Sequence, residues 1–191
     1  GSKRGILFKG GLALEALKDV KQVVVDKTGT ITEGNFALQK CVVMEGTEED
    51  LLRLAGNCEM ISTHPIGNSI VNAGKEREIK LERPHKAEEI SGKGIRAVLK
   101  EGEVLCGNRS LMEENQIDLG EYEKKSYGTE VLVALNGKFI GYLVIADTIK
   151  EDAVSAVRQI KKENVDITML TGDAKKSADA IAREVGIENV Y

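Results

Sequence analysis

The stretch Val23-Val24-Val25-Asp26-Lys27-Thr28-Gly29-Thr30 gives the strongest indication of the fold. Its first three residues are apolar and β-branched, which is typical of a strand that is covered on both faces in the middle of a parallel sheet. Asp26 then lies at the carboxyl end of that strand, where ligand sites of open α/β sheets occur. Gly29 and the backbone N–H groups around it can wrap an anion. The stretch therefore predicts an α/β domain with an anion-binding turn after Asp26.

A second unit of the same kind precedes the end of the chain. Residues 167–170 read as a strand, and Thr171-Gly172-Asp173 follows directly. Apolar residues at helical spacing flank this strand on both sides: Ala153, Ala156, Val157 and Ile160 before it, and Ala178, Ile181, Ala182 and Val185 after it. The order helix, strand, loop, helix indicates a doubly wound, Rossmann-type parallel sheet.

The segment between these ends has a different pattern. Thr47 with Asp50 three residues later predicts a capped helix, and Pro65 is suited to the first turn of a second helix. Asn136-Gly137 between two apolar runs predicts a β-hairpin, and residues 95–106 predict a further antiparallel pair. This middle segment is therefore an α+β domain with an antiparallel sheet.

These patterns together predict a discontinuous organisation. We expect one α/β domain built from residues 1–34 and 147–191, interrupted by an α+β domain of residues 35–146.

Composition excludes several classes of protein. The formal net charge of −4, with no Lys/Arg run longer than two, lacks the basic surface that nucleic acids require. Three cysteines without a C-x-x-C pair indicate neither a disulfide framework nor a zinc site. No apolar run approaches the roughly 18–20 residues that span a bilayer, so we expect a soluble chain. Because Gly1-Ser2 resembles the remnant of a removed tag, we expect a fragment of a longer protein.

The pentapeptide Asp26-Lys27-Thr28-Gly29-Thr30 resembles the phosphorylation signature of P-type ATPases, which have a haloacid-dehalogenase-like fold. Residues 5–11 with Leu14-Glu15 look like the segment that joins a transmembrane helix to the phosphorylation domain in heavy-metal pumps. Residues 147–150 and 171–173 are similar to the next two phosphorylation motifs of that family, in the same order. An isolated D-K-T would instead read as an Asx-type turn that caps a helix.

This resemblance implies that Asp26 takes the phosphoryl group from ATP and that the main-chain carbonyl of Thr28 helps Asp26 to hold Mg²⁺. Thr171 would bond the phosphoryl oxygens, and Gly172 would let the backbone approach closely. From the residues alone, Asp147 is equally well read as a helix cap with Lys150 as its solvated partner. The catalytic set that the resemblance implies is Asp26, Lys27, Thr28, Asp147, Thr171, Gly172 and Asp173.

A second group of residues resembles the nucleotide-binding domain of the heavy-metal subgroup, in which a histidine–proline pair like His64-Pro65 is typical. The resemblance implies that Glu59 and His64 bind the adenine end of ATP. The rest of the cleft would be lined by Gly92, Gly94 and Asn108, with Ile95 as an apolar wall. Read alone, a single histidine is more often structural than a ligand. The chain contains no P-loop sequence, so ATP must be held by another device.

Two other readings remain open at this stage. Soluble phosphatases of the same fold carry a second aspartate two residues after the nucleophile, as acid and base, whereas this chain has Thr28 there. A non-catalytic nucleotide-binding module is the other alternative, because the family's G-D-G-x-N-D motif does not occur before Tyr191. We therefore expect that this chain binds ATP but hydrolyses it poorly or not at all.

For the parent protein, the resemblance implies an ATP-driven export pump for heavy-metal cations at the cytoplasmic face of the cell membrane. Its partners would be the transmembrane and actuator domains, with a transported metal that this chain does not itself bind. Residues 62–65 and 8–11 resemble the zinc and cadmium type, while Gly107-Asn108-Arg109 looks as much like the copper type.

Overall fold

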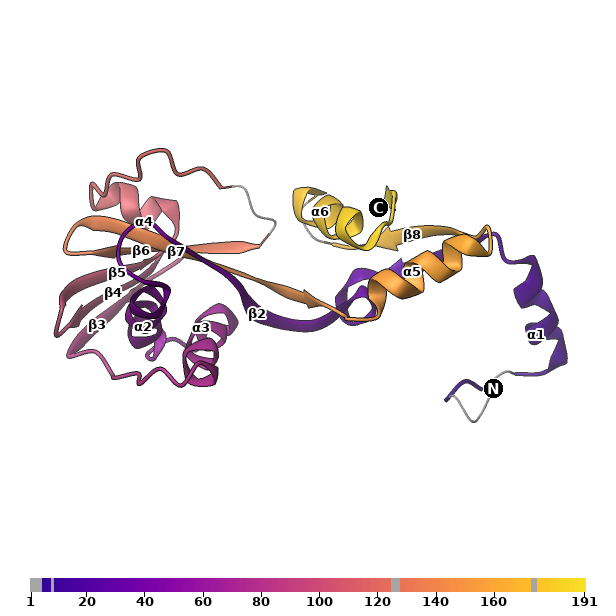
Figure 1. The fold of residues 1–191 in the computed structure, drawn as a ribbon, viewed down its shortest axis with the longest axis horizontal. Helices are drawn as coiled ribbons and strands as arrows, with labels where there is room; N and C mark the ends of the chain where they lie inside the picture. Colours follow the sequence, from indigo (N-terminus) through magenta and orange to yellow (C-terminus); the bar gives the residue numbers. More distant parts are fainter. Residues whose placement is uncertain (1–4, 8, 125–127, 173–174) are drawn as a thin grey trace. The chain divides into compact units, whose positions relative to one another are not determined.

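The chain divides into two compact units. The computed structural model describes residues 5–7, 9–124, 128–172 and 175–191. Unit 1 consists of residues 1–33 and 149–191, and unit 2 consists of residues 34–148. Both boundaries fall within long strands, β2 (Thr32–Val43) and β7 (Lys138–Ile149), close to the junctions expected near residues 34 and 147 (Figure 1).

Unit 1 is a parallel sheet with helices. Its strands β1 (Gln22–Asp26), β8 (Asp166–Leu170) and β9 (Asn189–Val190) are arranged in the order β1-β8-β9, and both pairings are parallel. Its helices are α1 (Gly11–Ala16), α5 (Ala153–Lys162) and α6 (Lys175–Val185). Because strands and helices alternate around a parallel sheet, the predicted α/β class is confirmed.

The predicted position of the first strand within the sheet is wrong. Val23 to Val25 was expected in the middle of a sheet covered on both faces, but β1 lies at an edge of the described sheet and pairs only with β8. Val24 is accordingly 54% exposed. The buried central strand is β8, in which Ile167 is 3% and Met169 0% exposed. A β-branched run therefore identified the strand but not its neighbours.

The helices of unit 1 follow the predicted apolar stripes with one exception. Ala178, Ile181, Ala182 and Val185 of α6 are all buried, and Gly186 ends the helix with φ of 88°. In α5, Ala153 and Val157 are buried, whereas Ala156 is exposed although its spacing fits the stripe.

Unit 2 is built on a six-stranded sheet in the order β2-β7-β6-β5-β4-β3. Its remaining strands are β3 (Lys86–Ile90), β4 (Gly94–Leu99), β5 (Gly102–Gly107) and β6 (Thr129–Leu135). The ladders from β3 through β7 are antiparallel, as predicted. Asn136 and Gly137 join β6 to β7 with φ of 49° and 82°, the left-handed pair that a two-residue hairpin requires.

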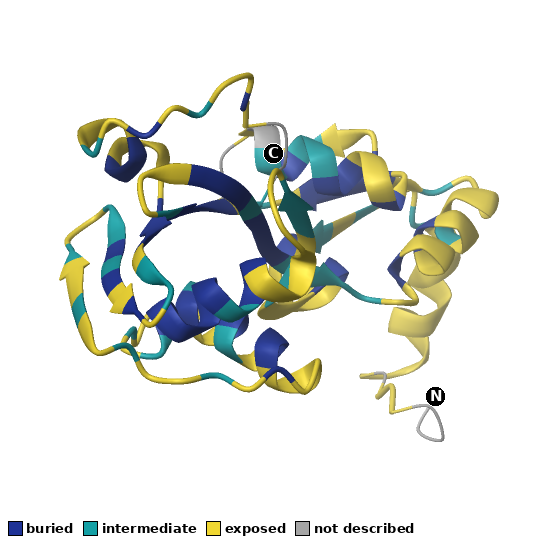
Figure 2. Ribbon diagram, turned by 60° about the vertical axis from the view of Figure 1, so that its left-hand side comes forward, coloured by how far each residue is buried: buried dark blue, intermediate teal, exposed yellow. Residues whose placement is uncertain are grey.

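Helices cover both faces of this sheet (Figures 1 and 2). On one face, α2 (Glu48–Glu59) and α3 (Pro65–Glu76) bury the larger core, and on the other α4 (Arg109–Glu114) covers a smaller one. Side chains of β5 and β6 alternate between the two cores, as the two-residue period of a strand demands. The Thr47 side chain caps α2 by accepting from the N–H of Asp50 at 3.1 Å, as its sequence predicted.

Within the described residues, the longest apolar helical stretch falls short of what crossing a membrane would need.

Removing a large side chain from the core of unit 2 tests this architecture. Leu52 on α2 is 0% exposed, so Leu52→Ala leaves a cavity and we expect a loss of about 2–5 kcal/mol in the free energy of unfolding. Leu12→Ala is the matched control, because Leu12 is 84% exposed and its truncation costs roughly 0.5 kcal/mol or less. Urea denaturation followed by circular dichroism measures both, and equal losses in the two variants would contradict this packing.

Candidate functional site

Asp26 is the last residue of β1, and its side chain is exposed. The turn that follows, residues 27–31, is not a regular helix, because Thr28 has φ −75° and ψ 123° and Gly29 has φ 78°. A positive φ of this size favours glycine, so Gly29 allows the backbone to reverse directly beside the carboxylate. Lys27, in contrast, is only 4% exposed.

Polar contacts fix the shape of this turn. The hydroxyl of Thr32 donates to the carbonyl of Lys27 at 3.1 Å. Lys150 donates twice, from Nζ to the carbonyl of Gly29 at 2.8 Å and from its N–H to the carbonyl of Ile31 at 3.0 Å. Sequence reasoning left Lys150 outside the catalytic set, but the structure makes it the residue that holds the turn after Asp26.

Thr171 and Gly172 leave the sheet at the same edge as this turn. The register pairs Asp26 with Leu170, so the next residues of both strands emerge side by side. The N–H of Thr171 donates to the carbonyl of Tyr191 at 2.9 Å. Asp173 lies outside the described residues. At this edge unit 1 gathers Asp26, Lys27, Thr28, Thr171 and Gly172.

Asp147 has a different setting from the one its motif suggested. It was expected to open a helix, but it lies within β7, and α5 begins only at Ala153. Its Oδ1 accepts from the N–H groups of Gly34 at 3.0 Å and Asn35 at 2.9 Å. Asp147 thus belongs to unit 2, where it ties β7 to the start of β2, and it does not cap a helix.

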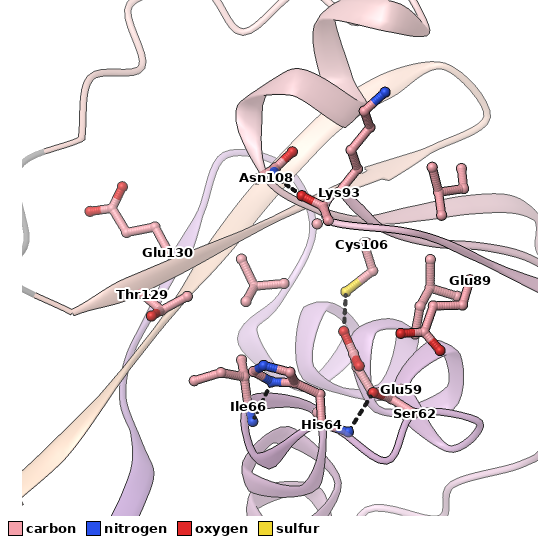
Figure 3. A pocket seen from close by; sticks show the side chains of 17 residues that line it. Glu59, Ser62, His64, Ile66, Glu89, Lys93, Cys106, Asn108, Thr129 and Glu130 are labelled. Atoms are coloured by element: carbon pink, nitrogen blue, oxygen red, sulfur yellow. Dashed lines mark hydrogen bonds between the residues drawn. The ribbon is translucent and has the colours of Figure 1, made fainter.

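A pocket of about 300 Å³ lies within unit 2 (Figure 3). The predicted nucleotide residues Glu59, His64, Gly92, Gly94, Ile95 and Asn108 all line it. Its other lining residues come from the same parts of the chain and from β3, β5 and β6: Ser62, Ile66, Gly67, Glu89, Ile90, Lys93, Cys106, Gly107, Thr129, Glu130 and Val131. Segments more than 70 residues apart in sequence therefore converge on one cavity.

Glu59 is the buried acid of this pocket. It ends α2, is 7% exposed, and accepts from the thiol of Cys106 at 3.6 Å between Sγ and Oε1. Burial raises the pKa of the Glu59 carboxyl, and Glu89 adds to this shift, while hydrogen bonds from Cys106 and Ser62 oppose it.

His64 is the N-cap of α3. Its Nδ1 accepts from the N–H of Ile66 at 3.2 Å, while its own N–H donates to the Ser62 hydroxyl at 3.1 Å. Pro65 follows at the first helical position, where its missing N–H costs nothing. His64 therefore has a structural task in addition to lining the pocket, and its exposed ring leaves Nε2 facing outward from the cap.

The glycine loop has no room for side chains where it meets β5. A Cβ on Gly94 would lie 2.2 Å from the carbonyl oxygen of Cys106, and one on Gly107 would lie 2.1 Å from that of Lys93. Asn108 secures the loop, because its Nδ2 donates to the carbonyl of Gly92 at 2.9 Å and its Oδ1 accepts from the N–H of Leu111 at 3.1 Å. Asn108 thus shapes the pocket through the backbone.

Sequence reasoning missed three pocket residues beside Glu59, namely Ser62, Gly67 and Cys106. Cys106 pairs with Ile95 across β4 and β5, a long-range register that no local pattern contains. Gly67 lies inside α3, where its sequence gave no signal beyond a weak helix former. The β6 contributions to the pocket were missed for the same reason as Cys106.

The model of the haloacid dehalogenase-like hydrolase family matches residues 20–191. The chain belongs to the haloacid dehalogenase-like hydrolase family. Within that family, its relatives are heavy-metal-transporting P-type ATPases, and the predicted resemblance is confirmed.

Two relatives and one solved structure illustrate this. The chain is 42% identical over its whole length to a cadmium, zinc and cobalt-transporting ATPase of Bacillus subtilis (strain 168), of which it covers 27%. It is 40% identical, again over its whole length, to a probable copper-exporting P-type ATPase of Archaeoglobus fulgidus, of which it covers 24%. The chain is also similar to the crystal structure of a zinc-transporting PIB-type ATPase in the E2.Pi state, with 31% sequence identity and a TM-score of 0.82. The match covers the whole of this chain and 32% of the chain of that ATPase. The chain thus spans about a quarter to a third of these proteins.

Thr28 stands at the position where soluble phosphatases of this fold carry their proton-transfer aspartate. Thr28 follows Asp26 by two positions and is exposed, and its side chain has no carboxyl proton to give or take. Among the described residues, no three histidine, cysteine or acidic side chains gather into a metal cluster.

Glu59 gives a prediction for pH-dependent stability. Its raised folded-state pKa means that its contribution to stability is present below the unfolded value of 4.5 and is lost as the pH rises through the folded value. Glu59→Gln removes this titration, so the stability of the variant relative to wild type should increase from about pH 4 to about pH 7. Urea denaturation at the two pH values measures this. Glu76→Gln, at an exposed position of α3, is the control and should show no such trend.

Proposed function

We propose that this chain is the nucleotide-binding and phosphorylation portion of an ATP-driven pump that exports heavy-metal cations. Asp26 is the residue that becomes phosphorylated. The observation that carries the proposal is the exposed Asp26 carboxylate at the sheet edge shared with Thr171, at the end of the parallel β1–β8 pair. Unit 1 then acts as the phosphorylation domain and unit 2 as the nucleotide-binding domain.

Phosphoryl transfer at Asp26 follows from its exposure and its turn. A carboxylate oxygen of Asp26 bonds to the γ-phosphorus of ATP as the bond from that phosphorus to the β–γ bridging oxygen breaks, and ADP leaves. Gly29 allows the backbone to reverse beside the Asp26 carboxylate. Lys150 stabilises this turn by donating a hydrogen bond to the carbonyl of Gly29. Because Thr28 cannot act as a general acid or base, the acyl phosphate persists long enough to drive a conformational cycle.

The residues at this edge fit Mg²⁺. The ion prefers oxygen ligands, and the exposed carboxylate of Asp26 and the main-chain carbonyl of Thr28 are such donors on adjacent stretches of backbone. When bound, Mg²⁺ would neutralise charge on the phosphoryl group. The Thr171 side chain and the backbone N–H of Gly172 would bond the phosphoryl oxygens at the same edge.

The pocket of unit 2 fits the base and sugar of ATP. Its volume of about 300 Å³ lies at the lower end of the usual range for small-molecule sites. Glu59 and His64 would bind the adenine end, while Gly92 and Gly94 let backbone groups approach the ligand and Ile95, 2% exposed, forms an apolar wall. Asn108 supports the glycine loop.

The transported cation is a soft or borderline metal of the zinc, cadmium and copper group. Relatives that carry such metals support this, and the relative named for cadmium, zinc and cobalt shares slightly more identity, 42%, than the copper exporter at 40%. We propose zinc or cadmium, with copper as the alternative. In the parent protein the chain would meet transmembrane and actuator domains at the cytoplasmic face of the membrane.

Nucleotide binding is tested on this chain with His64→Gln. Loss of the imidazole removes both a pocket wall and the side-chain cap of α3, so we expect ATP affinity to fall about fivefold or more by isothermal titration calorimetry. His85→Gln changes the other histidine, which lies outside the pocket, and should bind like wild type. An unchanged affinity in His64→Gln would count against the assignment.

Phosphorylation is tested in the full-length parent protein. Asp26→Asn removes the nucleophilic oxygen, so acid-stable, hydroxylamine-sensitive incorporation of phosphate from γ-labelled ATP should vanish while ATP binding persists. Asp19→Asn, a few residues earlier and exposed, is the control and should be labelled normally. Labelling that survives in Asp26→Asn would refute the role of this aspartate.

A further inference from the structure

The Glu59 carboxyl group lies between helix α3 and strand β5. Glu59 ends α2 and is 7% exposed, with Gly67 of α3 against one carboxyl oxygen and Cys106 of β5 against the other. Figure 3 shows the sulfur of Cys106 pointing at the carboxyl and Ser62 beside it. Each oxygen of this carboxyl thus has a distinct neighbour.

On the α3 side, Oε2 of Glu59 lies against Gly67, in space that a side chain at this position would occupy. A Cβ on Gly67 would lie 2.4 Å from Oε2 of Glu59 and 2.9 Å from both Cβ and Oγ of Ser62. Contacts this short are not tolerated, so even a methyl group would displace the carboxyl. The Gly67 backbone is within a helix and has no positive φ, so glycine is not required by its conformation. Glycine disfavours a helix relative to alanine, so the space that the side chains of Glu59 and Ser62 need accounts for a glycine at this position.

On the β5 side, the neighbour is the thiol of Cys106. Cys106 is 0% exposed, and its Sγ lies 3.6 Å from Oε1 of Glu59. The Cys106 carbonyl also packs against Gly94 of the glycine loop, so the same residue lines the pocket from its backbone and from its side chain. A thiol is a weak donor, but a buried one with a single carboxyl acceptor still favours one orientation.

We propose that Gly67 and Cys106 are positioning residues, which fix the two oxygens of the Glu59 carboxyl and thereby set the affinity of the pocket for the base of ATP. This inference rests on the proposed nucleotide site and adds to it residues that act through Glu59. Polar groups in a pocket contribute to affinity only when they are held where the ligand needs them, and displacement of such a group by about 1 Å is costly.

Four variants of this chain test the proposal by calorimetric titration with ATP. Gly67→Ala and Cys106→Ala should each weaken ATP binding, by about tenfold and about threefold respectively, as expected for a misplaced and a loosened polar contact. Gly74→Ala makes the same substitution in the same helix, where the added methyl meets only the flexible side chain of Leu81, and should bind like wild type. Cys106→Ser keeps a donor and should restore most of the affinity.

A double-mutant cycle shows whether Gly67 acts through Glu59. In a Glu59→Ala background the added methyl group can displace only Ser62 and no carboxyl, so adding Gly67→Ala should cost much less affinity than it does in the wild type. Equal losses from Gly67→Ala with and without the carboxyl would overturn the proposal, as would wild-type affinity in both Gly67→Ala and Cys106→Ala. Circular dichroism establishes that each variant is folded, and should Gly67→Ala fail to fold, Cys106→Ala with its serine rescue decides.

A second readout does not depend on nucleotide. The ¹³C resonance of the Glu59 carboxyl, assigned by its loss in Glu59→Ala, should move at fixed pH in ligand-free Gly67→Ala and stay in place in Gly74→Ala. If wild type binds no ATP, the proposed function fails, while this resonance still reports on the positioning. A resonance unchanged in Gly67→Ala would show that Gly67 does not position the carboxyl.

Discussion

The parallel pairing of β1 with β8 is the constraint on which the candidate phosphorylation site depends. It sets Asp26 level with Leu170, so that two turns separated by most of the chain leave the sheet together. The hydrogen bond from Gln22 Nε2 to Thr168 Oγ1, 2.9 Å long and spanning 146 residues, fixes the same register further along the strands. Since a slip by one residue would turn every side chain to the other face, this register is what brings the Asp26 carboxylate and the turn at Thr171 to one edge.

Local signals in the sequence were enough for the fold class and several elements. The Thr47 cap, the Pro65 start and the Asn136-Gly137 hairpin each depend on residues close in sequence, and the structure contains all three. The exposure of Val24 and the place of Asp147 inside β7 went against expectation, because they depend on which strand lies beside which. Strand β2 was not predicted, and its weak sequence pattern agrees with its burial, since Thr32 is its one buried residue.

The pocket residues likewise fall into two groups: those that short motifs predict, and those that are recognised only from the packing of distant elements. Glu59, His64, Gly92 and Gly94 were predicted from short motifs, and all line one cavity. The neighbours that hold Glu59 were not predictable, because a glycine inside a helix reads as a weak helix former and a strand cysteine reads as core. Gly67 and Cys106 lie beside Glu59 only because α3 and β5 pack against the end of α2.

The buried cysteines have a consequence for a protein whose relatives carry cadmium, zinc, cobalt and copper. Soft metal ions bind thiolates, and a thiol must lose its proton first. Burial raises the pKa of Cys58 to about 12 and raises the pKa of Cys106 as well, so near neutral pH both stay protonated inside the core of unit 2. A soft metal ion could bind either buried thiol only if the core opened and the thiol lost its proton.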